Sequence, residues 1–337
     1  MKACRREPTP RPPLWLMRQA GRYLPEYRKL RSEVDFLQMC KRPELAAEVT
    51  LMPVRRFSLD AAIIFADILL VAEPLGVGLN FTKGEGPVIY RPVRGTAEIE
   101  ALESVDVAES LGFVFEAVRV TRAALAPDLP LIGFCGAPFT VASYLVQGCG
   151  SKHYERTKLL MYEAPAAWHK LMEKLVRISI DYLNGQIEAG VQAVQIFDSW
   201  VGALSPADYR KYVLEHSRTL ISSIKSGVPV IHFGTGTAGL LELLREAGGD
   251  VIGVDWRIDL GQAWSRLGDG VGIQGNLDPV VLLGGAEEIR RQTHSILKAV
   301  NNRPGHIFNL GHGILLQTPV ESVAALVDAV HEHAGHV

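Results

Sequence analysis

Residues 191–200 read VQAVQIFDSW, an apolar run that ends in the polar turn Asp198-Ser199-Trp200. A run this short, rich in apolar and β-branched residues, predicts a buried strand of a parallel sheet. The same pattern recurs along the chain. It predicts seven strands, at residues 59–65, 131–134, 191–197, 228–233, 251–254, 271–273 and 306–309.

Amphipathic stretches between these strands predict helices at residues 106–125, 166–189, 206–226, 240–247, 287–300 and 319 to about 333. Two helix starts carry a clear signal. Ser205-Pro206-Ala207-Asp208 and Thr318-Pro319-Val320-Glu321 each offer a hydroxyl at the N-cap, proline at N1 and an acid at N3. Strands that alternate with helices indicate the α/β class.

Polar, glycine-rich turns follow nearly every predicted strand, for example Gly136-Ala137-Pro138, Gly234-Thr235-Gly236 and Gly311-His312-Gly313. This favours a somewhat distorted (β/α)8 TIM barrel, in which all strands end at one mouth, over a doubly wound sheet with one switch point. The eighth strand is not clear, and residues 88–91 are a weak candidate. Residues 1–58 lack a strand pattern and predict a helical arm, packed on the barrel or over its mouth. We expect a single domain over residues 1–337.

Composition narrows the class of function. The 337 residues are 47% hydrophobic and carry 35 Lys and Arg against 37 Asp and Glu, so no global basic field favours nucleic acid. The four cysteines form no C-x-x-C pair and no His-x-Cys, which argues against a disulfide framework or a metal site. No apolar signal region or membrane-length run is present, so we expect a cytoplasmic protein without a membrane partner.

The N-terminal 31 residues hold nine Lys and Arg against two Glu. Arg18 and Arg22 would share a face if their segment is helical, and arginine binds carboxylate or phosphate in a bidentate way. The alternative is a solvated basic face with an Arg22–Glu26 ion pair. Composition alone leaves both interpretations open.

Residues 17–28, MRQAGRYLPEYR, resemble the signature of uroporphyrinogen decarboxylases almost letter for letter. The resemblance continues at residues 65–69, 133–140, 197–200, 253–256, 274–279 and 309–313, and so covers essentially the whole chain. It implies a carboxy-lyase of haem and tetrapyrrole biosynthesis that acts without a cofactor. This enzyme converts the four acetates of uroporphyrinogen III to methyl groups, giving coproporphyrinogen III and carbon dioxide. The resemblance also suggests a homodimer.

The same resemblance implies a set of site residues. Arg18 and Arg22 would meet substrate carboxylates, and Asp67 would face the pyrrole N–H groups. Tyr144, Ser199 and His312 would contact the substrate, as would the residues between the two arginines, Gln19, Ala20 and Gly21. We expect the catalytic group to be Asp67, Arg18, Arg22, His312 and Tyr144. Two residues near these positions depart from the family pattern. The family usually has serine where this chain has Ala66, and glycine where this chain has Cys149.

Each of these residues also has an ordinary structural interpretation. Asp67 could be a helix N-cap, His312 a loop histidine satisfied by backbone, Tyr144 a core aromatic and Ser199 a helix cap. Three other features are given no functional role. Gly234-Thr235-Gly236 is only a weak match to a phosphate-binding loop. Cys135 is expected to be a buried small hydrophobe, and His331, His333 and His336 are expected to form a solvated tail.

The implied chemistry needs a sink for the electrons left when carbon dioxide departs. No pyridoxal, thiamine or metal motif is present, so the protonated pyrrole itself would be the sink, with Asp67 stabilising its charge. The proton donor stays open among His312, Tyr144 and an arginine. Two rivals are zinc-dependent corrinoid or thiol methyltransferases, which the missing His-x-Cys disfavours, and a non-catalytic tetrapyrrole-binding protein.

Overall fold

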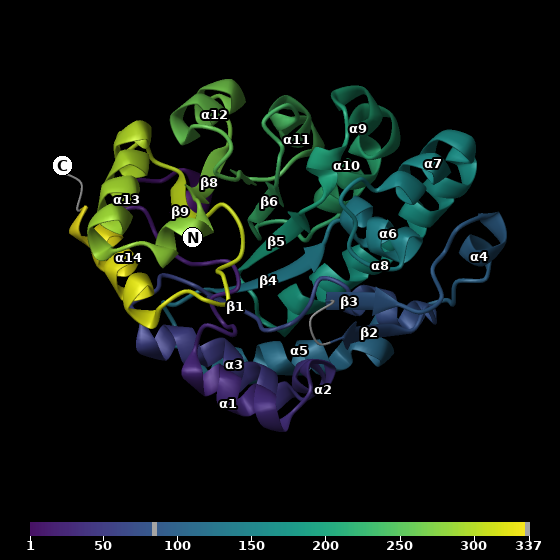
Figure 1. Ribbon diagram of the computed structural model, residues 1–337, viewed down its shortest axis with the longest axis horizontal. Helices are drawn as coiled ribbons and strands as arrows, with labels where there is room; N and C mark the ends of the chain where they lie inside the picture. The colour runs from purple at the N-terminus through teal and green to yellow at the C-terminus, as the bar shows by residue number, and fades with distance from the viewer. Residues whose placement is uncertain (83–85, 334–337) are drawn as a thin grey trace.

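The computed structural model describes residues 1–82 and 86–333. Its main sheet is parallel, has the strand order β1-β4-β5-β6-β7-β8-β9, and curls into a partial barrel (Figure 1). All seven predicted strands are confirmed, with bounds shifted by a few residues. They are β1 (Ala62–Ile63), β4 (Leu131–Gly136), β5 (Ala193–Asp198), β6 (Val230–Gly234), β7 (Val251–Gly253), β8 (Gly272–Leu277) and β9 (His306–Leu310).

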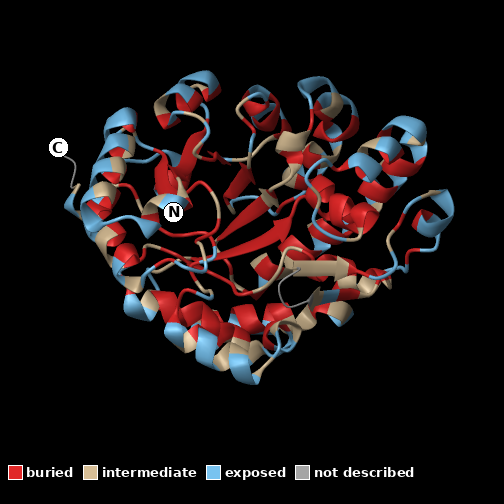
Figure 2. Cartoon of the chain, viewed as in Figure 1, coloured by how far each residue is buried: buried red, intermediate tan, exposed pale blue. Residues whose placement is uncertain are grey.

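The helices surround this sheet, with buried residues toward it and exposed residues toward solvent (Figure 2). They include α4 (Thr96–Glu100), α5 (Val107–Ala124), α6 (Pro138–Gln147), α7 (Glu155–Glu163), α8 (Pro165–Ala189), α11 (Leu241–Ala247), α12 (Leu260–Leu267), α13 (Ala286–Val300) and α14 (Val320–Glu332). The single helix predicted over residues 206–226 is wrong. It is two helices, α9 (Pro206–Tyr212) and α10 (Leu214–Ser222), because Val213 leaves the helical conformation.

Of the two predicted capping boxes, one is confirmed. Ser205 Oγ accepts from the Asp208 N–H at 3.1 Å, as a capping hydroxyl should. The second is wrong: α14 begins at Val320 with Pro319 as its N-cap. The Thr318 N–H instead donates to Leu315 O at 3.2 Å, which places Thr318 in the preceding turn, outside the helix.

The expected eighth strand does not lie at residues 88–91. That stretch overlaps β3 (Gly86–Ile89), which forms an antiparallel hairpin with β2 (Leu79–Thr82) outside the main sheet. The place between β9 and β1 is filled instead by residues 13–15, which we call the closing segment. Phe308 N donates to Pro13 O at 2.9 Å, and Asp60 N donates to Leu14 O at 2.8 Å.

The closing segment runs parallel to β9, through a bridge between Leu14 and Phe308. The sequence predicts no strand structure in residues 1–58, and the closing segment is an exception to that expectation. Prolines hid this segment, because Pro13 removes a backbone donor and is atypical of a central strand. The pairing here needs only the Pro13 carbonyl, which remains able to accept.

The N-terminal arm also contains three helices, as predicted: α1 (Pro25–Glu33), α2 (Phe36–Lys41) and α3 (Pro43–Arg56). Pro25 and Pro43 occupy first-turn positions, where a missing N–H costs nothing. Figure 1 shows these helices along the outside of the sheet, and α3 packs on α5 and β1. These three helices therefore cover the barrel wall and do not cover the mouth.

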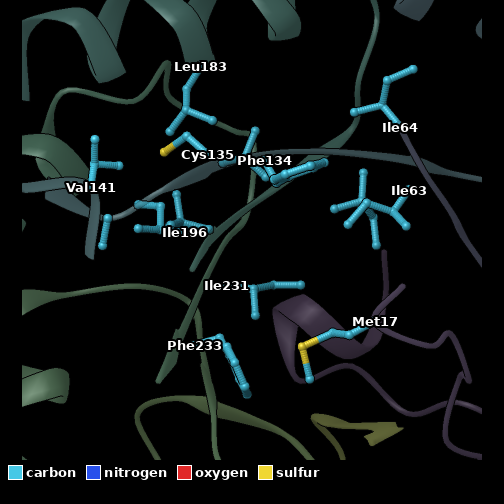
Figure 3. Packing of buried hydrophobic residues seen from close by; sticks show 14 of the residues in the cluster. Met17, Ile63, Ile64, Phe134, Cys135, Val141, Leu183, Ile196, Ile231 and Phe233 are labelled. Atoms are coloured by element: carbon cyan, nitrogen blue, oxygen red, sulfur yellow. The ribbon is translucent and has the colours of Figure 1, made fainter. Parts of the chain in front are cut away.

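The hydrophobic core fills the curl of the sheet and the layer beneath the helices. Met17, Ile63, Ile231 and Phe233 belong to this core cluster, and Figure 3 shows them close to one another. Cys135 is fully buried in the same cluster, as expected of a small hydrophobe. Within the described residues, no helix is both long and apolar enough to cross a membrane.

Candidate active site

The expected site residues come from segments that share one end of the barrel. Asp67 follows β1, Tyr144 lies on α6 after β4, Ser199 follows β5 and His312 follows β9. The closing segment is parallel to β9, so the loop after it, which holds Arg18, opens at the same end. Carboxyl ends of parallel strands line the mouth of a barrel, where active sites form. The N-terminal loop that holds Arg18 therefore joins a mouth built mainly by later loops.

Buried polar side chains fix the arginine loop. Gln19 is fully buried, accepts from Leu16 N at 3.0 Å and donates to Ala61 O at 3.1 Å. Asn309 Oδ1 accepts from Met17 N at 3.0 Å, which ties the same loop to β9. Gln19 thus positions the loop. Ala20 is half-buried and packs on the core.

Backbone geometry also restricts this loop. Arg18 has a φ of 61°, in the left-handed region. A Cβ on Gly21 would lie 2.9 Å from Arg18 O, so only glycine fits there without a shift. The condition for Arg18 and Arg22 to share a helical face is not met, because α1 begins only at Pro25.

The ion pair offered as the alternative for Arg22 does not form. Glu26 accepts two hydrogen bonds from Arg56 instead, at 3.0 and 3.1 Å. Arg18 and Arg22 are both exposed, and neither belongs to any ion pair found among the described residues. Neither guanidinium is therefore held by an ion pair of the described chain, and both can bind an anion.

Asp67 is a half-buried carboxylate at the end of β1. Its Oδ1 accepts from Leu69 N at 2.8 Å, so the capping interpretation is partly right. Burial raises the pKa of Asp67 from 3.8 to about 6, and the Leu69 N–H and the charge of Arg18 only partly oppose this. Asp67 is accordingly ionised at neutral pH and lies within electrostatic range of Arg18.

His312 lies in the loop after β9, close to Arg18. A Cβ on Gly313 would lie 2.8 Å from Arg18 Cγ, so the arginine side chain runs across this loop. Burial lowers the pKa of His312 to about 4, and the charges of Arg18 and Arg257 add to this. The ring is therefore neutral. Since its Nδ1 accepts from Gly313 N at 2.7 Å, Nε2 carries the proton and remains a donor.

Tyr144 is nearly buried, and its ring lies 6.1 Å from that of Trp200. Burial raises the pKa of Tyr144, and Asp67 and Arg18 act on it in opposite directions, so its hydroxyl stays protonated near both groups. Ser199 is half-buried in the adjacent turn. It is not a helix cap, because Trp200 holds that position for the short helix η3 (Val201–Ala203).

Sequence reasoning gave no role to Arg257, which also reaches the mouth. It follows β7 and pairs with the buried carboxylate of Asp255. Asp255 Oδ2 also accepts from Gly236 N at 2.7 Å. That N–H is therefore occupied, which further disfavours a phosphate loop at Gly234-Thr235-Gly236. The signal for Arg257 was its place in a turn after a strand.

Other candidate ligands do not gather here. Among residues 1–82 and 86–333, no three His, Cys, Asp or Glu side chains are arranged to hold a metal ion. The expected solvated histidine tail is wrong for His331 and His333, which are half-buried, because His331 lies 3.8 Å from Asp60 and His333 lies 3.2 Å from Asn302. His336 falls outside the described residues.

Comparison with known proteins finds a matching family. The sequence profile of the family uroporphyrinogen decarboxylase (URO-D) matches residues 1–333. The uroporphyrinogen decarboxylase of Carboxydothermus hydrogenoformans is 55% identical, with 98% of this chain and 95% of the relative aligned. That of Chloroflexus aurantiacus is 54% identical, over 99% of this chain and 95% of the relative.

Solved structures share the fold. A methyltransferase from Methanosarcina mazei superposes with a TM-score of 0.84 at 22% identity, covering 99% of this chain and 97% of that one. A B12-independent methionine synthase from Shewanella sp. W3-18-1 has a TM-score of 0.55 at 14% identity, covering 87% and 86% of the two chains. At such low identity these structures establish only a fold of the TIM-barrel type.

Proposed function

The chain belongs to the uroporphyrinogen decarboxylase family, and from this we propose that it converts uroporphyrinogen III to coproporphyrinogen III and carbon dioxide. The observation that carries the proposal is that Arg18, which has no ion-pair partner among the described residues, lies in a loop at the same mouth as the ionised Asp67 and acts electrostatically on it. A substrate with acid groups at its rim and N–H donors at its centre matches that arrangement of charge.

In this mechanism Arg18 and Arg22 bind carboxylates at the rim of the macrocycle. Asp67 accepts from the central N–H groups and stabilises positive charge on the protonated pyrrole. When the bond between the acetate methylene and its carboxylate breaks, the electron pair enters the protonated ring and carbon dioxide leaves. A proton then takes the place of carbon dioxide and completes the methyl group, and the ring releases the proton that it had gained, so that one proton is consumed in all. Asp67 acts by fixed charge and forms no covalent bond.

Tyr144, Ser199 and His312 supply hydrogen bonds to the substrate. The neutral His312 offers its Nε2–H, and the protonated Tyr144 hydroxyl can donate as well. Gln19 and Gly21 contribute through the shape of the arginine loop, and Ala20 through its backbone and its methyl surface. These assignments follow the family motif, and each can be tested by substitution.

The decisive experiment is turnover of uroporphyrinogen III under anaerobic, reducing conditions, with products separated by carboxylate number. We expect stepwise loss of four carboxylates, ending at coproporphyrinogen III. Binding without release of carbon dioxide would indicate a tetrapyrrole-binding protein and would contradict the proposal. A zinc assay separates the methyltransferase alternative, because that class holds zinc through histidine and cysteine.

We also propose that the reaction needs no cofactor, because the pyrrole ring can itself accept the electron pair. Dialysis against a chelator should leave the rate unchanged, and a rate restored only by added metal or pyridoxal phosphate would contradict this. We further propose that the chain is one domain and works as a cytoplasmic homodimer. Light scattering after gel filtration should then give about twice the 36.9 kDa of one chain.

A further inference from the structure

A third arginine, Arg257, lies at the mouth and has no assigned role. It occupies the turn after β7, and its side chain is 53% exposed. Exposed arginines are usually solvated and mobile, and most of them contribute little. The surroundings of Arg257 differ, because two neighbours hold its guanidinium in one place.

The first neighbour is Asp255, whose side chain is only 2% exposed. Asp255 Oδ2 pairs with Arg257 Nη1, and Asp255 Oδ1 accepts from Arg257 N at 3.1 Å. The second neighbour is Trp256, whose ring centroid lies 4.2 Å from the guanidinium carbon. A guanidinium has five N–H donors, and the described hydrogen bonds use only one of them. Arg257 is thus oriented in advance and still able to bind.

The loop that holds Arg257 adjoins the loop of His312. A Cβ on Gly311 would lie 2.7 Å from Trp256 N, so the turns after β7 and β9 touch. The charges of Arg18 and Arg257 both act on the His312 ring. Strands β8 and β9 separate β7 from the closing segment, so Arg257 reaches a different part of the rim from Arg18.

We propose that Arg257 binds a peripheral carboxylate of the porphyrinogen, as a third substrate-binding arginine beside Arg18 and Arg22. The inference rests on the proposed function, because that substrate carries carboxylates on all four pyrroles. Two arginines from one loop can reach only part of such a rim. Arg257 adds a planar, preoriented donor at a second point and restricts rotation of the macrocycle in the mouth.

The test is the binding of uroporphyrin, the oxidised macrocycle, which is not turned over, followed by fluorescence over a range of sodium chloride concentrations. Arg303 provides a matched control. Its guanidinium lies 4.0 Å from the Trp264 ring and it pairs with Asp269 at 2.5 Å, but it precedes β9 and so lies at the other end of the barrel. We compare the wild type with Arg257→Gln, Arg257→Lys and Arg303→Gln.

We expect Arg257→Gln to weaken binding about ten-fold at low salt and to make the affinity less dependent on salt, because one ionic contact is lost. Arg257→Lys should keep the salt dependence and recover part of the affinity, and Arg303→Gln should match the wild type. Wild-type affinity in Arg257→Gln would overturn the proposal. So would weaker binding with an unchanged salt dependence, which indicates only a disturbed Asp255 turn. Wild-type turnover, measured in parallel, tests the decarboxylase proposal separately.

Discussion

Burial shifts the pKa values of two mouth residues in opposite directions, because it favours the neutral form of each. It raises the pKa of Asp67 to about 6 and lowers that of His312 to about 4. At neutral pH, Asp67 is therefore an ionised carboxylate and His312 is a neutral imidazole. Pairs of titratable groups whose environments separate their protonation states are typical of catalytic sites. The charge pattern suits a substrate that becomes positive at its centre and is negative at its rim.

The role of Asp67 can be tested by removing its charge while keeping its shape. In Asp67→Asn, the rate of single-turnover decarboxylation should fall on the order of a hundred- to a thousand-fold. Binding should fall less, because the interaction is strongest in the transition state. Asp67→Glu should keep partial activity, since its charge is displaced by one methylene. A wild-type rate in a folded Asp67→Asn would return Asp67 to a capping role.

The pKa of Asp67 also predicts how activity depends on pH. The ionised form is the active one, so kcat/KM should fall as the pH drops through about 6. A profile measured from pH 4.5 to 8 should show this acid limb for the wild type. The limb should be missing from the residual activity of Asp67→Asn.

The contribution of Asp67 to the free energy of unfolding should depend on pH in the opposite sense to kcat/KM. The folded-state pKa of Asp67 lies above the ordinary 3.8, so its favourable contribution is present below about 3.8 and is lost as the pH rises through about 6. Asp67→Asn should therefore be more stable than the wild type at pH 8, on the order of 1 kcal/mol after allowance for solvent screening. The difference should shrink toward pH 4 in urea unfolding.

The two free arginines lead to a separate prediction. Loss of the Arg18 or Arg22 guanidinium should cost on the order of 1.5–3 kcal/mol of substrate binding or transition-state stabilisation, the range for hydrogen bonds to charged groups. Arg22→Lys should recover only part of this, because a point charge cannot replace a planar fork. Steady-state kinetics provide the measurement. Unchanged kinetics in both Arg18→Ala and Arg22→Ala would make the segment a solvated basic face.

Among the elements, those whose side chains are all buried could be predicted from the sequence. Strands such as β4 and β6 are buried at every residue, and that burial requires the continuous apolar runs that marked them. Short sequence motifs predicted the structure less reliably where contacts with the surrounding chain determine the local conformation. Thr318-Pro319-Val320-Glu321 has the letters of a capping box, but its threonine belongs to the turn before the helix.

The candidate site likewise contains features that the sequence predicts and features that only tertiary contacts reveal. The mouth loops could be predicted because each follows a recognisable strand, and the family motif identified Arg18 and Asp67. Arg257 was missed because its significance depends on contacts with Trp256 and the buried Asp255, which a sequence does not display. The orienting role of Gln19 was missed for the same reason, since its partners Leu16 and Ala61 lie on two separate segments.

The two helix starts predict different effects of substitution. Ser205→Ala removes a hydroxyl that caps α9, and should lower the free energy of unfolding by about 0.5–2 kcal/mol. Thr318→Val keeps the shape of a buried side chain whose hydroxyl has no partner among the described residues, so it should be neutral or slightly stabilising. Urea unfolding of the two variants gives the comparison. A larger loss in Thr318→Val would show that its hydroxyl is bonded after all.

At the scale of the whole molecule, the closing segment, near the start of the sequence, pairs with β9, near its end, to close the barrel. The closing segment bonds to Phe308 on one side and to Asp60 on the other. Trp15 anchors it: the side chain is 2% exposed and its Nε1 donates to Gln274 Oε1 at 3.0 Å inside the barrel. The next residues are the arginine loop, so closure of the barrel and assembly of the mouth depend on the same contacts.

Trp15→Ala should therefore open the barrel at one seam, the contacts of the closing segment with Phe308 and Asp60. Loss of so large a buried side chain should cost about 3–5 kcal/mol. Amide exchange should accelerate first at Phe308 and Asp60, whose N–H groups donate to the closing segment, while Val194, bonded to Pro229 between β5 and β6, stays protected. Substrate binding should weaken in parallel, because the loop that holds Arg18 loses its anchor. If all three amides exchange faster to the same extent, residues 13–15 are part of one cooperative core and not a separate seam.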